Sequence, residues 1–161
     1  MDTVTYPDPQ VAALVTESFV PVKVKVKEHP ELVHEFVVSW TPHIVLLDGE
    51  GRLIHRLEGW FAPQVLHAQL VIGLGKGDLA AERYDEAAAR FEAVVAQHPH
   101  TESAAEALYW LGAARYRKSH EPADLLTEWK RLQAEAPYSP WADRSRVPAV
   151  KSPAQLEQRD A

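Results

Sequence analysis

The sequence predicts a mixed α/β unit followed by an all-helical unit. Strand-like apolar patterns occur only within residues 1–74, and alanine-rich stretches with helical spacing of apolar residues fill most of the chain after them. The composition, 46% hydrophobic and 25% charged, is ordinary for a folded globular protein. At 161 residues the chain is long enough for about one domain, or two small ones that share a core.

The first elements are a helix and a strand. Asp8 and Pro9 predict a helix start, because the Asp side chain can accept a backbone N–H bond and proline suits the first helical position. Valine then alternates with lysine over residues 20–26, which predicts a strand with one buried face. Pro21 is typical of a strand start or an edge strand.

A short helix and a β-hairpin come next. His29-Pro30 opens a helix that runs to about Val37. The apolar run His43–Leu47 and the segment Arg52–Glu58 flank Asp48-Gly49-Glu50-Gly51, whose residues favour a turn, so we expect a hairpin. Another helix begins at Pro63 and closes this part of the chain.

The helical part contains a repeat. The first copy consists of Leu74, Gly75, Tyr84, Ala87, Phe91 and Pro99, and the second of Leu111, Gly112, Leu125, Trp129 and Pro137. The period is 112 − 75 = 37 residues. The pattern resembles the tetratricopeptide family over about residues 68–137, with a weaker second copy, which implies two stacked helical pairs.

The repeat also predicts a packing scheme and a groove. A small residue in each first helix lets the second helix approach, and Phe91 and Trp129 fill the space between them. In tetratricopeptide-like proteins the first helices line a concave groove, and the resemblance implies a site there for an acidic or aromatic peptide. The alternative is that its tyrosines pack between helices and its basic residues are solvated. The groove residues are Lys76, Tyr109, Tyr116 and Arg117.

The N-terminal part carries a second resemblance. Its order of strand, helix, Trp40-Thr41-Pro42, strand, glycine-rich turn, strand and helix is similar to the C-terminal two thirds of a thioredoxin-like domain. The resemblance implies a cis peptide bond before Pro42, and a backbone at Thr41 that pairs with an extended substrate. Residues 1–9 resemble the stretch that follows the Cys-x-x-Cys motif in bacterial thioredoxin-like proteins.

The chain has no cysteine, and the central first strand of that fold is also absent. These residues therefore supply no disulfide, thiolate ligand or thiol nucleophile. One explanation is a longer native protein with redox cysteines upstream of Met1. The other is a rearranged sheet, in which residues 20–26 pair beside His43–Leu47 or the exposed strand edge accepts a partner, including a second copy in a homodimer.

Composition and motifs disfavour several other classes. A net charge of −6 disfavours nucleic-acid binding, and the absence of a long apolar run or leader-like start predicts a cytoplasmic protein without membrane contact. The histidines form no ligand set, so we expect no metal and no cofactor. His43 is the histidine closest to the implied site, because it follows Pro42.

The sequence therefore predicts an incomplete thioredoxin-like sheet with helices, fused to a two-repeat tetratricopeptide-like array. The expected boundaries are 1–74 for the first part and 68–138 for the repeats, with a shared helix from about residue 63. A short helix and a loosely ordered tail, from about Ala149, occupy 139–161. The predicted function is non-catalytic protein or peptide binding, at Trp40, Thr41 and Pro42 and at the groove residues. The alternative is the C-terminal part of a thiol–disulfide oxidoreductase.

Overall fold

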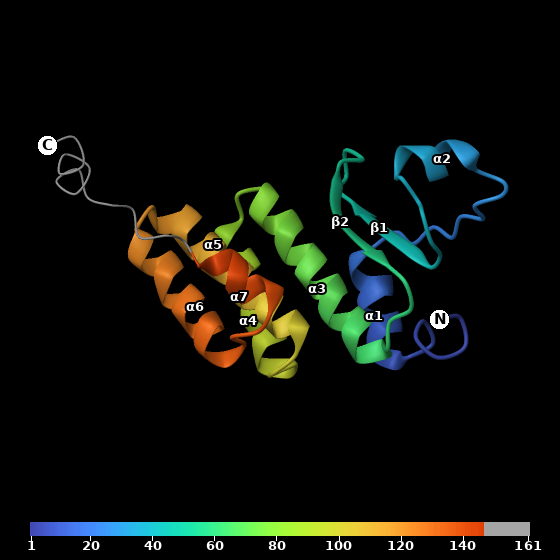
Figure 1. Ribbon diagram of the computed structural model, residues 1–161. Helices are drawn as coiled ribbons and strands as arrows, with labels where there is room; N and C mark the ends of the chain where they lie inside the picture. Colours follow the sequence, from blue (N-terminus) through green and yellow to red (C-terminus); the bar gives the residue numbers. More distant parts are fainter. Residues whose placement is uncertain (147–161) are drawn as a thin grey trace, which may run out of the picture.

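The computed structural model describes residues 1–146 and contains seven helices and a two-stranded antiparallel sheet (Figure 1). The predicted tail from about Ala149 lies outside the described residues. In chain order the elements are α1 (Pro9–Ser18), α2 (Pro30–Glu35), β1 (His43–Leu47), β2 (Leu53–Glu58), α3 (Pro63–Ala80), α4 (Tyr84–Gln97), α5 (Glu102–Ser119), α6 (Pro122–Glu135) and α7 (Pro140–Ser145).

The predicted helix starts and the hairpin are confirmed. The side chain of Asp8 accepts hydrogen bonds from the backbone N–H groups of Gln10 and Val11, at 3.0 and 3.2 Å, and so caps α1. In the turn between β1 and β2, the Asp48 carboxylate accepts a 2.9 Å bond from the backbone N–H of Arg52. The backbone N–H and the side chain of Arg52 both donate hydrogen bonds to Asp48. These bonds lower the pKa of the Asp48 carboxyl and stabilise the turn.

The predicted strand over residues 20–26 is wrong. The structure has no strand there, and neither β1 nor β2 pairs with this segment. Val20 and Val22 are 92% and 78% exposed. Alternating valine and lysine favours a half-buried strand only where another strand supplies hydrogen bonds and a packed face, and no described residue does so.

The apolar interior consists of two clusters that meet at α3. One cluster joins α1 and the hairpin to Leu66 and Leu70 on the first half of α3. The other fills the space between α3, α4, α5, α6 and α7, with Ile72 and Leu79 contributed by α3. In Figure 1 α3 accordingly lies between the hairpin and the helices α4 to α7. A single helix packed on both sides gives the two parts a continuous junction.

The packing role predicted for the repeat glycines is confirmed. A Cβ atom at Gly75 would lie 2.7 Å from Cε1 of Phe91, and one at Gly112 would lie 3.0 Å from Cδ1 of Trp129. Each aromatic ring therefore occupies the space that a side chain at the glycine would need. The two helical pairs, α3 with α4 and α5 with α6, use the same device.

Candidate functional site

The outer edge of β1 is the first feature of the candidate site. The strand pairs on one side with β2, in a register that sets His43 opposite Glu58 and Leu46 opposite His55. Among residues 1–146 no strand pairs with its other side. In an antiparallel pair each strand directs half of its N–H and C=O groups away from its partner. The outer edge of β1 therefore presents unpaired backbone donors and acceptors.

The segment that leads into β1 lengthens this edge. The peptide bond between Thr41 and Pro42 is cis, as expected. The Pro42 carbonyl accepts a 2.8 Å bond from the N–H of Gly59, which continues the pairing of the hairpin. Within residues 1–146 the backbone of Thr41 takes part in no backbone–backbone hydrogen bond, so its polar groups remain free to pair.

Polar side chains lie at the same end of the hairpin. The Ser39 hydroxyl donates to the Glu58 carboxylate, 3.1 Å from Oε2, and Nδ1 of His43 lies 3.5 Å from that same oxygen. The His43 side chain is only 3% exposed, and neither ring nitrogen makes a hydrogen bond to a described residue. His43, the histidine expected nearest the implied site because it follows Pro42, is thus covered by protein.

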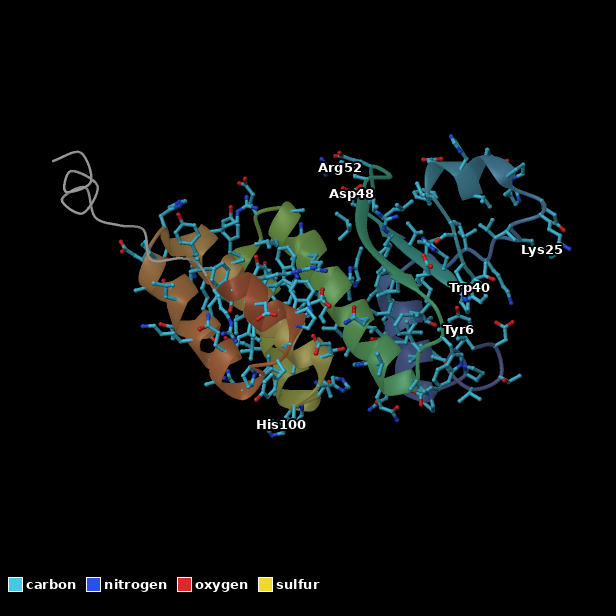
Figure 2. All side chains as sticks on the ribbon, in the orientation of Figure 1. Tyr6, Lys25, Trp40, Asp48, Arg52 and His100 are labelled. Atoms are coloured by element: carbon cyan, nitrogen blue, oxygen red, sulfur yellow. The ribbon has the colours of Figure 1, made fainter. Side chains whose placement is uncertain are left out.

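Exposed apolar residues precede and follow the hairpin in the sequence. Trp40 is 68% exposed and Trp60 is 60% exposed. Val20 and Val22 add further apolar surface, and their lysine neighbour Lys23 is held by a 2.8 Å bond to Asp2. Figure 2 shows Trp40 on the side of the hairpin that faces away from the helices α4 to α7. Exposed tryptophan side chains are unusual on a folded surface and are enriched where proteins bind partners.

Lys76, a predicted groove residue, is engaged inside the protein. Its ammonium group donates to Oε1 of Glu106 at 2.6 Å and to Nδ1 of His55 at 3.1 Å. It also lies 5.1 Å from the ring centre of Trp110 and 5.9 Å from that of Trp141. The side chain is 14% exposed, so its charge is largely balanced by internal contacts.

The other groove residues lie in two places. Tyr109 stacks on Trp129, with ring centres 5.0 Å apart, and also contacts Trp141, near which Lys76 lies. Arg117 instead lies over the ring of Tyr84 on α4, and Tyr116 is 38% exposed. The structure thus brings Lys76 and Tyr109 to one aromatic cluster, while Arg117 joins a different helix.

One cluster of polar residues has no counterpart in the sequence analysis. His55, Gln69, Ser103 and Glu106 form a connected set of hydrogen bonds with Lys76. Gln69 and Lys76 are seven residues apart on α3, and Ser103 and Glu106 are three apart on α5, so each pair shares a helix face. Polar residues at those spacings among the buried positions of α3 and α5 are the signal that was available.

Comparison with protein-family models, with curated proteins and with solved structures gives no match. Within residues 1–146 no three acidic or histidine side chains are grouped so that they could hold a metal ion. No helix in that range combines the length and the apolar character needed to cross a bilayer. The geometry of the described residues is therefore the basis for a functional proposal.

Proposed function

We propose that this protein binds another polypeptide in an extended conformation, which adds as a strand to the outer edge of β1. The observation that carries the proposal is the unpaired edge of β1, lengthened by the free backbone of Thr41. Addition of a strand satisfies backbone donors and acceptors that otherwise depend on water. The register between β1 and β2 determines which backbone groups of β1 point away from β2.

The side chains beside the edge favour an apolar partner segment. Trp40 precedes the edge directly and is 68% exposed. Its ring offers a large contact surface with little loss of conformational freedom on binding. In an added strand every second side chain faces the same side of the sheet, so an alternating apolar sequence matches one apolar face and one solvated face.

The proposed role is non-catalytic binding, and the two resemblances support the binding. The chain order of α2, Trp40-Thr41-Pro42, β1, β2 and α3 is similar to the part of a thioredoxin-like domain in which the residue before this proline pairs with substrate. The helical pairs that follow resemble a tetratricopeptide-like array, a type of repeat that commonly binds peptides. The second candidate, part of a thiol–disulfide oxidoreductase, uses the same edge for substrate but needs cysteines that these 161 residues lack.

A labelled peptide tests the proposal. The probe is a nine-residue peptide of alternating valine and threonine with a terminal fluorophore, and binding is read as fluorescence anisotropy. The control peptide carries the same side chains but is N-methylated at alternate positions, which removes the backbone donors that would face β1. We expect the unmodified peptide to bind and the N-methylated peptide to bind at least tenfold more weakly, a loss of about 1.4 kcal/mol.

A pair of variants locates the site. Trp40→Ala should weaken peptide binding by about tenfold, because a buried aromatic anchor typically contributes more than 1 kcal/mol to an interface. Tyr138→Ala removes an aromatic ring that is 97% exposed in the helical part, and it should leave binding unchanged. Equal binding of the two peptides, no binding of either, or equal effects of the two substitutions would contradict the proposal.

A further inference from the structure

A buried cluster of polar residues connects the hairpin to the helices. We call it the His55 cluster, and its members come from β2 (His55), α3 (Gln69 and Lys76) and α5 (Ser103 and Glu106). Ser103 is 5% exposed and Glu106 is 6% exposed. The proposed binding site uses none of these residues.

The contacts of the cluster fix the protonation state of His55. Nδ1 of the ring lies 3.1 Å from Nζ of Lys76, and Nε2 lies 2.9 Å from Oε1 of Gln69. An ammonium group can only donate, so Nδ1 must accept, and the ring proton must therefore lie on Nε2 and point at the amide oxygen of Gln69. The imidazole is neutral in this arrangement.

Several contacts hold the Lys76 side chain in place. It donates at 2.6 Å to Glu106, whose other carboxylate oxygen accepts at 3.0 Å from Nε2 of Gln69. The rings of Trp110 and Trp141 lie 5.1 and 5.9 Å from its nitrogen, and such ring faces attract an ammonium group. The Lys76 ammonium group next to His55 is thus held by the Glu106 carboxylate and by two aromatic rings.

Few charges act on the ring of His55. Lys76 on α3 faces it directly, and Glu106 on α5 lies beyond Lys76. The opposite strand β1 contributes the apolar Leu46. Burial and, next, the Lys76 charge lower the pKa of His55, against smaller opposing effects of the Gln69 hydrogen bond and Glu106.

We propose that His55 makes the junction between the hairpin and α3 sensitive to acid. A proton on Nδ1 would meet the ammonium of Lys76 at 3.1 Å with no acceptor between them. The Lys76 side chain is tied to Glu106, so the histidine must leave, and the contact of His55 with α3 is lost with it. Acidification therefore loosens the hairpin from α3 before it affects the interior of the helices.

The direction of the pH effect follows from the neutral folded ring. Because folding lowers the pKa of His55, its contribution to stability is complete above the ordinary histidine pKa of about 6.5. That contribution falls as the pH drops below this value, since the opened hairpin takes up a proton that the closed one excludes. The opening equilibrium should grow by up to about tenfold for each unit by which the folded pKa is lowered.

Amide hydrogen exchange of the full chain measures this opening. We compare rates between about pH 7.5 and about pH 5, corrected for the intrinsic pH dependence of exchange. We expect the opening of β2 amides to increase toward acid pH relative to α5 amides. His55→Gln should abolish this difference between β2 and α5, because an amide does not titrate. The matched control, His34→Gln, replaces an exposed histidine on α2 and should behave as the unmodified protein.

A direct titration keeps the proposal falsifiable if the His55 variant does not fold. Nitrogen-15 chemical shifts of the unmodified protein report both the tautomer and the pKa of His55. We expect a proton on Nε2 at neutral pH and a midpoint below the ordinary histidine value of about 6.5. A proton on Nδ1, a midpoint at or above about 6.5, or equal pH dependence of β2 exchange in the unmodified and His55→Gln proteins would overturn the proposal.

Discussion

The N-terminal residues up to α3 and the helices α3 to α7 bury their apolar side chains to very different degrees. Fifteen large apolar side chains are exposed among the described residues; eleven precede Pro63 and four follow it. In the helical part consecutive helices pack against one another, and α7 packs on both α5 and α6. In the N-terminal part α2 has few contacts with other elements, and β1 has one strand neighbour.

The difference follows from where each kind of element finds its partners. A helix satisfies its own backbone hydrogen bonds and needs only an apolar surface, which the next helix along the chain supplies. A strand needs a second strand at hydrogen-bonding distance, and that strand can be remote or belong to another chain. The helices α3 to α7 therefore satisfy their own backbone hydrogen bonds, whereas the small sheet leaves an edge that can take a partner.

The largest expected effect is in the helical array. Phe91 is fully buried against Gly75, so Phe91→Ala leaves a cavity in the cluster that all of α3 to α6 share. We expect a loss of about 3–5 kcal/mol in the free energy of unfolding, measured by urea denaturation. Val20→Ala, at a side chain that is 92% exposed, serves as the control and should change stability by less than about 0.5 kcal/mol. Similar losses for the two variants would contradict the contrast between the regions.

A smaller effect separates two glycines of α3, Gly75 and Gly77. Gly75→Ala places a methyl group 2.7 Å from the Phe91 ring, and it should destabilise the protein by about 1–3 kcal/mol. Gly77→Ala meets nothing closer than 3.9 Å, at Ile54, and it should be neutral or stabilising by up to about 1 kcal/mol through helix propensity. Thermal unfolding of both variants checks this, and a stabilising Gly75→Ala would refute the close approach.

The smallest effect on stability is expected at the exposed valines. Val22→Lys changes a side chain that is 78% exposed, so the free energy of unfolding should shift by less than about 0.5 kcal/mol. A large loss of stability in chemical denaturation would show that the segment is packed, against the exposure described above.

Local chemistry made most of the fold predictable. The start of α1 follows from Asp8 and Pro9, and the hairpin from the turn residues between β1 and β2, because both depend on neighbours in the sequence. The close approach at Gly75 was also predictable, since the repeat sets its distance from Phe91. The resemblances to known families remain predictions about function.

Long-range pairing limited the rest. The alternation over residues 20–26 indicates a strand, but a pattern within one segment carries no information on whether a partner strand is present. The same limit applies to Lys76: the repeat register assigns it to the groove, but does not show that it contacts Glu106 and His55. Those contacts join residues 30 and 21 positions apart, and no local spacing encodes them.

Amide-resolved hydrogen exchange over β1, with and without the alternating valine–threonine peptide, tests the central claim most directly. In the free protein we expect alternate amides of His43–Leu47, those directed away from β2, to exchange rapidly while the buried amides of α5 exchange slowly. The peptide should slow exchange at those outer amides and leave α5 unchanged. Outer amides that are already protected in the free protein, or peptide protection confined to the helices, would contradict the claim that β1 offers an open edge.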